Sequence, residues 1–184
     1  VLFRSLPADG AARGVAPGRL QALVGLRDVD LQPWALEFSP SSPHLIVVGP
    51  PGSGKSATLR VLTLALAQAY SPEEVQILIV DFQRHLSAEG ATDLAGLPHV
   101  QAIITRYAQL AAVLEPLAAH YAGAPPAEGR PALFVLIDNY DGFVEEVEVE
   151  EKRQDKGLAV LARLAREYGA DGLHFVLAGG LPIV

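Results

Sequence analysis

One short stretch of the sequence combines the residue types that a phosphate group requires of a protein. It consists of Gly49-Pro50-Pro51-Gly52-Ser53-Gly54-Lys55-Ser56. Glycines let the backbone wrap around an anion without interference from Cβ atoms. Lys55 supplies a mobile positive charge for β and γ phosphates, and the Ser56 hydroxyl can ligate Mg²⁺. A helix that follows such a loop points its N-terminal amides and the positive end of its dipole at the same anion.

The spacing of these residues matches the pattern G-x-x-x-x-G-K-[ST], which is the P-loop or Walker A motif. The alternative is a glycine-rich turn between a strand and a helix with an incidental lysine. The motif requires a strand before it and a helix after it, and the hydrophobic pattern predicts both. We therefore assign nucleotide binding to Gly49, Pro50, Pro51, Gly52, Ser53, Gly54, Lys55, Ser56 and Ala57.

A second acidic position is expected to hold the metal ion. Ala132–Ile137 is a continuous apolar segment typical of a buried strand, and it leads directly into Asp138. This is the form of a Walker B segment, in which Asp138 would hold a Mg²⁺-bound water near Ser56. The alternative is an aspartate that only ends a strand and caps a turn. Together with the P-loop, the sequence predicts a Mg²⁺ site at Ser56 and, through water, Asp138.

Two departures from this pattern bear on catalysis. P-loop ATPases that activate water usually carry Glu after the Walker B Asp, and Asn139 stands there instead. An amide cannot accept a proton at neutral pH, although it can orient a water molecule. The neighbouring predicted strand ends in Gly179-Gly180, which has no side chain to sense a γ-phosphate. Asp141 is the substitute candidate for the base. The sequence thus predicts nucleotide binding with slow or absent hydrolysis.

The elements that must position these residues alternate between strands and helices. This order is typical of βαβ units and a mostly parallel sheet covered on both faces, so we expect an α/β fold. Pro116 predicts a kink or a break in its helix, and the charged segment 145–156 predicts a solvated loop or a helix start. The expected strands are Ala35–Phe38, His44–Val48, Val75–Val80, Val100–Ile104, Ala132–Ile137 and His174–Ala178, and the expected helices are Ser56–Tyr70, Tyr107–Tyr121 and Gly157–Tyr168.

Composition excludes several other classes of protein. The chain has 184 residues, half of them apolar and 19% charged, which excludes disorder as its main state. It has no cysteine, so disulfides and thiolate metal sites are excluded, and its five histidines show no metal-ligand spacing. A net charge of -7 disfavours a broad nucleic-acid surface. The longest apolar runs, such as Leu45–Val48 and Ala132–Ile137, have four to six residues. They are too short for a membrane span, which needs about 20 residues.

The order of several segments resembles the FtsK/SpoIIIE family of P-loop ATPases, and within it the ATPase domains of EccC-type motors of type VII secretion. The likeness extends from about Val24 to Gly180. Asp138-Asn139-Tyr140-Asp141 and the missing Glu are most similar to the last, degenerate ATPase domain of those motors. The matching segments are 24–28, 43–45, the P-loop, 71–76, 80–84, 137–141 and 172–178.

The resemblance implies a three-layer P-loop sandwich over residues 26–184, preceded by an irregular leader or linker at 1–25. It implies ATP and Mg²⁺ as cofactors, neighbouring ATPase domains of the same protein as partners, and a WXG100-type helical hairpin as secreted substrate. It also implies a position at the cytoplasmic face, within a larger membrane-anchored protein. The sequence lacks the initial Met and the further strand such sheets usually have, so we expect a piece of a longer protein.

Two alternatives stay open. One is a substrate-binding or regulatory module that uses ATP structurally and does not hydrolyse it. The other is a DNA translocase motor of the FtsK type. DNA-pumping members keep an acidic pair and a polar sensor end, both of which this sequence lacks, so DNA is disfavoured as a partner.

Overall fold

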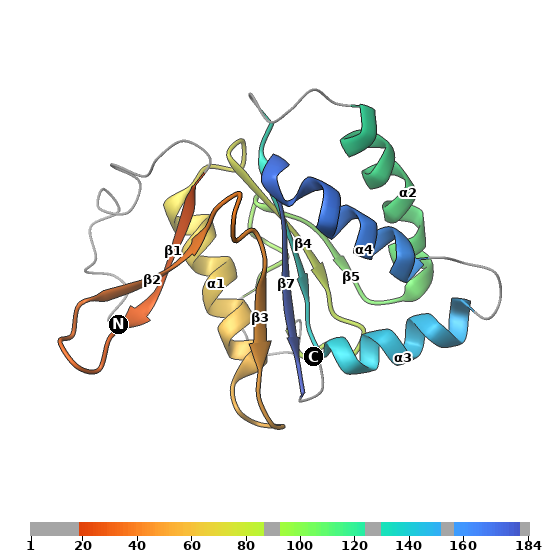
Figure 1. Cartoon of the computed structure of the whole chain (residues 1–184). Coiled ribbons are helices and arrows are strands. Elements are labelled where there is room, and N and C mark those ends of the chain that lie inside the picture. Colours follow the sequence, from red (N-terminus) through yellow and green to blue (C-terminus); the bar gives the residue numbers. More distant parts are fainter. Residues whose placement is uncertain (1–18, 87–92, 124–129, 152–156, 181–184) are drawn as a thin grey trace.

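The protein is described here from a computed structural model, which places residues 19–86, 93–123, 130–151 and 157–180. Strands and helices alternate along most of this chain (Figure 1). In chain order the elements are β1 (Leu20–Leu26), β2 (Pro33–Phe38), β3 (Leu45–Val48), α1 (Lys55–Ala69), β4 (Val75–Val80), β5 (Val100–Ile104), α2 (Tyr107–Gly123), β6 (Ala132–Ile137), α3 (Tyr140–Glu151), α4 (Gly157–Tyr168) and β7 (Leu173–Gly179).

Five strands form one parallel sheet in the order β3-β7-β6-β4-β5. Helix α1 covers one face, and α2, α3 and α4 cover the other (Figure 1). The last strand, β7, lies between β3 and β6, with Val48 beside Gly179 and Ile137 beside Leu177. The carboxyl ends of β3, β7, β6 and β4 therefore meet at one edge. The α/β class and the three-layer parallel architecture expected from the sequence are confirmed.

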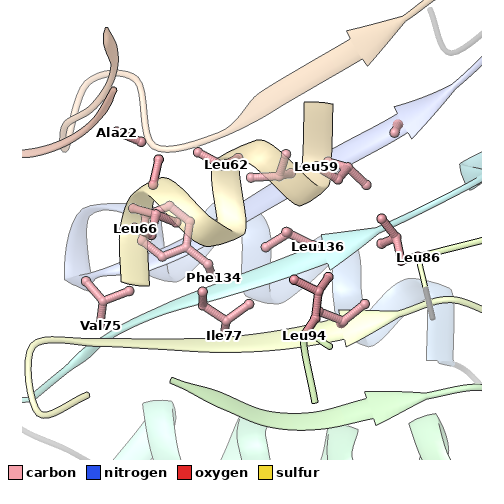
Figure 2. Close-up of a cluster of buried hydrophobic side chains, with 14 of the residues drawn as sticks. Ala22, Leu59, Leu62, Leu66, Val75, Ile77, Leu86, Leu94, Phe134 and Leu136 are labelled. Carbon is pink, nitrogen blue, oxygen red and sulfur yellow. The ribbon is translucent and has the colours of Figure 1, made fainter. Parts of the chain in front are cut away.

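The two faces of the sheet are built by alternation along each strand. In β4, Ile77 and Ile79 face α1, whereas Leu78 and Val80 face α2 and α3. The α1 layer is a hydrophobic cluster in which Leu59, Leu62 and Leu66 are fully buried (Figure 2). Burying one leucine side chain contributes roughly 1.5–3 kcal/mol, so the spacing of these leucines is sufficient to fix α1 on the sheet.

The β1–β2 hairpin corrects one sequence prediction. Residues 20–25 were expected within an irregular leader, but they form most of β1, which pairs antiparallel with β2. Ala22 is fully buried, and Leu20 and Val24 pack against the same cluster. Gly25 lies where the register shifts, and it concealed this alternation in the sequence. The rest of the expected leader, residues 1–18, lies outside the described residues.

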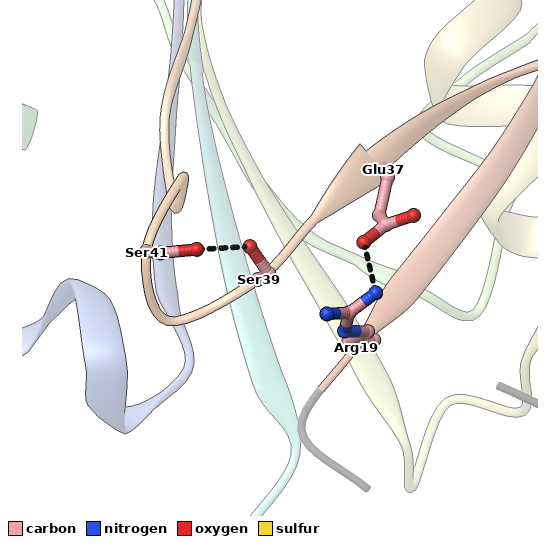
Figure 3. A network of polar contacts seen from close by, with 4 residues as sticks. All are labelled: Arg19, Glu37, Ser39 and Ser41. Atoms are coloured by element: carbon pink, nitrogen blue, oxygen red, sulfur yellow. Dashed lines mark hydrogen bonds and ion pairs between the residues drawn. The ribbon is translucent and has the colours of Figure 1, made fainter. Parts of the chain in front are cut away.

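Polar contacts complete the hairpin. The Arg19 guanidinium donates to the Glu37 carboxylate at 2.9 Å, and the hydroxyls of Ser39 and Ser41 are 3.1 Å apart in the turn that follows β2 (Figure 3). At the C-terminal end of α1, the Tyr70 hydroxyl accepts a hydrogen bond from the Gln21 N–H at 2.7 Å. The hairpin is thereby attached to the helix that follows the phosphate loop.

Most predicted elements are present within two residues of their expected bounds. A kink or a break was expected at Pro116, and helix α2 continues through it, so the break does not occur. The charged segment at 145–156 begins inside α3, which starts earlier, at Tyr140. Its start was missed because Asn139 adopts a left-handed conformation (φ 53°) before the helix, and no apolar period marks the first turn.

His174, on β7, is buried beside the α1 layer. Its Nδ1 lies 2.8 Å from the Pro43 carbonyl, and its ring packs 4.7 Å from that of Phe134, centroid to centroid. Burial is the main cause that lowers its pKa from 6.5 to about 4. Nearby His44 lowers it further, and the hydrogen bond to Pro43 opposes the shift.

We predict that His174 makes stability fall between pH 7 and pH 5. The unfolded state takes up a proton near pH 6.5 and the folded state only near pH 4. The contribution of neutral His174 to the free energy of unfolding is therefore complete above pH 6.5 and is lost as the pH falls toward 4. At pH 5 the loss is about 2 kcal/mol. Urea unfolding of His174→Gln should show a smaller loss than the unmodified chain. His120→Gln, at an exposed site, is the control, and equal losses in all three would refute the prediction.

Candidate nucleotide-binding site

The predicted phosphate loop lies between the end of β3 and the start of α1. Gly52 and Gly54 have φ angles of 77° and 91°, which side chains other than glycine strongly disfavour. A Cβ atom at Gly49 would collide with the Ser53 hydroxyl. The glycines are thus required by the backbone path of the loop itself.

Positive charge and free amides converge on this loop. The Lys55 ammonium donates to the carbonyl oxygens of Gly49 and Pro50 at 2.8 and 3.0 Å. Gly54 precedes the first turn of α1 and has no side chain to cap its amides. The N-terminus of α1 therefore presents its dipole and N–H groups toward the centre of the loop.

Asp138 lies across the site at the end of β6 and is only 5% exposed. Its Oδ1 accepts a hydrogen bond from the Asn139 N–H at 3.1 Å, whereas Oδ2 has no hydrogen-bond partner within the described part of the chain. Burial raises the pKa of this carboxyl, and the negative charge of Asp81 adds to the rise. The Ser56 hydroxyl lowers the pKa, because it lies close enough to hydrogen-bond to the carboxylate.

This arrangement suits a hydrated Mg²⁺ ion. A buried carboxylate oxygen without a partner, beside a serine hydroxyl and a second carboxylate, is compensated best by a cation. Mg²⁺ retains several waters and needs only one or two protein ligands besides phosphates. The described residues contain no cluster of three histidine or acidic ligands, so a metal cage made of protein alone is not formed in this part of the chain.

Asp141 is engaged by the end of β7. Its Oδ2 accepts a hydrogen bond from the Gly180 N–H at 2.6 Å. The carboxylate therefore joins the first turn of α3 to the end of the strand that, as expected from Gly179-Gly180, has no sensor side chain. A role of Asp141 as a general base stays a prediction.

One pocket of about 540 Å³ brings most of these groups together. Of the predicted binding residues, Pro50 and Ser53 do not line it, and the Ser53 N–H donates to the Pro50 carbonyl at 3.2 Å. Gln83 and His85 also line the pocket and were not predicted from the sequence, whereas Gly180 lines it at the strand end that the sequence placed beside the γ-phosphate. Gln83 and His85 follow the end of β4, at the same sheet edge as Asp138, and that position was the signal for them.

The strand, loop and helix, with a buried aspartate on a nearby parallel strand, define the P-loop class of nucleotide-binding proteins. The sequence model of the FtsK/SpoIIIE family matches residues 16–124. This covers more than half of the chain, which therefore belongs to the FtsK/SpoIIIE family.

Similar curated proteins include secretion and DNA-translocation motors. The chain is 45% identical over 94 residues to the ESX secretion system protein EccC of Thermomonospora curvata, covering 47% of this chain and 7% of that protein. It is 48% identical over 69 residues to EccC4 of Mycobacterium tuberculosis, covering 36% and 5%. It is 34% identical over 106 residues to the DNA translocase FtsK of Corynebacterium glutamicum, covering 56% and 11%. The chain thus spans a small part of these relatives.

Two solved structures share the fold. The cytoplasmic domain of the Thermomonospora curvata type VII secretion ATPase EccC superposes with a TM-score of 0.70 at 23% identity, covering 88% of this chain and 19% of that one. ATPases 2 and 3 of the same EccC, in complex with a signal sequence peptide, give 0.66 at 23% identity and cover 95% and 32%. The expected resemblance to EccC ATPase domains is confirmed. None of the described helices is both long and apolar enough to cross a bilayer.

We predict that Asp141→Ala lowers the free energy of unfolding by about 1–2 kcal/mol, because it removes a charged acceptor from the Gly180 N–H and an acidic residue from the first turn of a helix. Urea unfolding measures the change. Asp28→Ala, in the exposed hairpin turn, is the charge-matched control. A loss at Asp141 no larger than at Asp28 would contradict the structural role.

Proposed function

We propose that this chain binds ATP with Mg²⁺ and serves as an FtsK/SpoIIIE-type ATPase module of a type VII secretion motor similar to EccC. The observation that carries the proposal is the pocket in which the phosphate loop faces the unpartnered Oδ2 of Asp138. The ATPase domain is proposed to extend over residues 26–184, together with β1, which completes the hairpin on α1.

Each residue has a defined task in this proposal. The loop amides and the N-terminus of α1 bind the phosphates, and Lys55 neutralises their charge. Ser56 ligates the Mg²⁺ ion, and Asp138 holds one of its waters. The metal ion would offset phosphate charge when bound, while the chain's own residues fix the phosphates in place.

Hydrolysis is proposed to be weak or absent. Asn139 occupies the position of the usual glutamate and cannot accept a proton at neutral pH. The end of β7 presents Gly179-Gly180, whose only contribution at the pocket is backbone. One carboxylate oxygen of Asp141 is taken up by Gly180. A module that uses ATP structurally, to bind a substrate or regulate a neighbour, is the alternative these same features favour.

The partners follow from the relatives. One of the solved structures contains ATPases 2 and 3 of Thermomonospora curvata EccC in complex with a signal sequence peptide. By likeness, we propose that this chain works beside neighbouring ATPase domains, at the cytoplasmic face of a membrane-anchored protein, and handles a WXG100-type substrate. A DNA translocase is the second alternative, because a relative is the DNA translocase FtsK.

We predict that Lys55→Ala weakens ATP binding by about 10-fold or more, because a charge-assisted contact contributes roughly 1.5–3 kcal/mol. Titration calorimetry with Mg²⁺ present measures the affinity. Arg19→Ala removes one positive charge at the hairpin, where Arg19 pairs with Glu37, and should leave ATP binding unchanged. Equal affinity of Lys55→Ala and the unmodified chain would refute nucleotide binding at this loop.

The same preparation tests the rate of ATP hydrolysis. We expect it to stay below about 1 s⁻¹, which is the low end for ordinary enzymes.

We predict that the chain prefers a protein substrate to DNA. Nonspecific DNA affinity requires Lys and Arg, and the chain carries a net charge of -7. Two titrations at about 150 mM salt, where the Debye length is about 8 Å, compare a generic duplex with a helical-hairpin secretion substrate that keeps its C-terminal tail. The hairpin should bind more tightly. Micromolar binding of the duplex without binding of the hairpin would favour the DNA translocase.

A further inference from the structure

Gln83 stands on the wall of the pocket that faces the phosphate loop. It follows β4, and the sheet order places β7 and β6 between β4 and the loop strand β3. Its side chain is exposed and lines the same pocket as Lys55, Ser56 and Asp138. A ligand anchored in the loop would therefore meet Gln83 only with the far end of its phosphate chain.

A buried carboxylate, that of Asp81, stabilises the loop that carries Gln83. Asp81 is 1% exposed and accepts hydrogen bonds from the N–H groups of His85 and Leu86 at 2.8 and 2.9 Å. Its carbonyl accepts the N–H of Arg84 at 3.1 Å, and Arg84 adopts a left-handed φ of 59°. This turn fixes the backbone on both sides of Gln83 and so preorganises the residue.

The amides of Gln83 and Asn139 meet above Gly142 in the first turn of α3. A Cβ atom added to Gly142 would lie 2.9 Å from Nε2 of Gln83 and would collide with Nδ2 of Asn139. Both amides also line the pocket. Gly142 therefore provides the space in which two side chains from different strand ends, β4 and β6, come together.

We propose that Gln83 recognises the terminal phosphate of a nucleoside triphosphate, from a position close to Asn139 and Gly142. The inference deepens the proposed function and rests on it. The Gln83 amide N–H donates to a γ-phosphate oxygen, a contact that a diphosphate cannot make. The residue that distinguishes triphosphate from diphosphate is thus placed at the end of β4, because Gly180 at the end of β7 has no side chain to make this contact.

Calorimetry with the Mg²⁺ complexes of ADP and of a non-hydrolysable ATP analogue tests the proposal. Gln83→Ala should weaken binding of the analogue about 10-fold, because a hydrogen bond to a charged group is lost, and should leave ADP binding within about twofold. Gln101→Ala is the matched control, since Gln101 lies exposed on the outermost strand β5. It should change neither affinity.

Gly142→Ala is the second variant, because it displaces the two amides without removing them. Alanine is the better helix former, and the colliding atoms are the ends of flexible side chains, so folding should be preserved. It should lower affinity for the triphosphate analogue selectively. Equal weakening of both nucleotides by Gln83→Ala, or of neither, would overturn this inference alone. No nucleotide binding by the unmodified chain would overturn the proposed function as well.

Discussion

The parallel pairing of β7 between β3 and β6 is the constraint on which the site depends. This pairing extends past the strands themselves, since the Gly49 N–H donates to the Gly179 carbonyl at 3.2 Å. The adjacent β6–β4 pairing is extended in the same way, because the Asp138 N–H donates to the Val80 carbonyl at 3.0 Å. Residues more than 80 positions apart in the chain thus reach the same edge. A register shift of one residue in β6 would turn Asp138 to the other face of the sheet.

Two buried carboxylates at neighbouring strand ends give this edge its electrostatic character. The backbone amides of its own loop accommodate the carboxylate of Asp81. Asp138 keeps one oxygen without such a partner and has a raised pKa, mainly through burial. Asp81 is therefore a structural acid, whereas Asp138 is available to a ligand. Lys55 and the N-terminus of α1 lie on the opposite wall, so the pocket has a positive side and a negative side.

Local sequence was sufficient where one short segment determined the outcome. The P-loop, the strand before Asp138 and the leucine spacing of α1 each carry their signal within about ten residues, and the structure contains all three elements. Gln83 was missed because its place in the pocket depends on the order of the strands in the sheet. The hydrogen bond between Asp141 and Gly180 was missed for a similar reason, since the two residues lie 39 positions apart in the chain. The strand β1 was missed because Gly25, at the register shift of its pairing with β2, interrupts the alternation of apolar residues.

Helix α1 is held at both of its ends. Its first turn borders the phosphate loop, and at its last turn the Tyr70 hydroxyl is bound to the N–H and the carbonyl of Gln21 in the hairpin. Fifteen residues correspond to a rod about 22 Å long at 1.5 Å per residue. A rigid helix moves as one body, so any tilt of α1 that accompanies a ligand in the loop also moves the hairpin that packs on it.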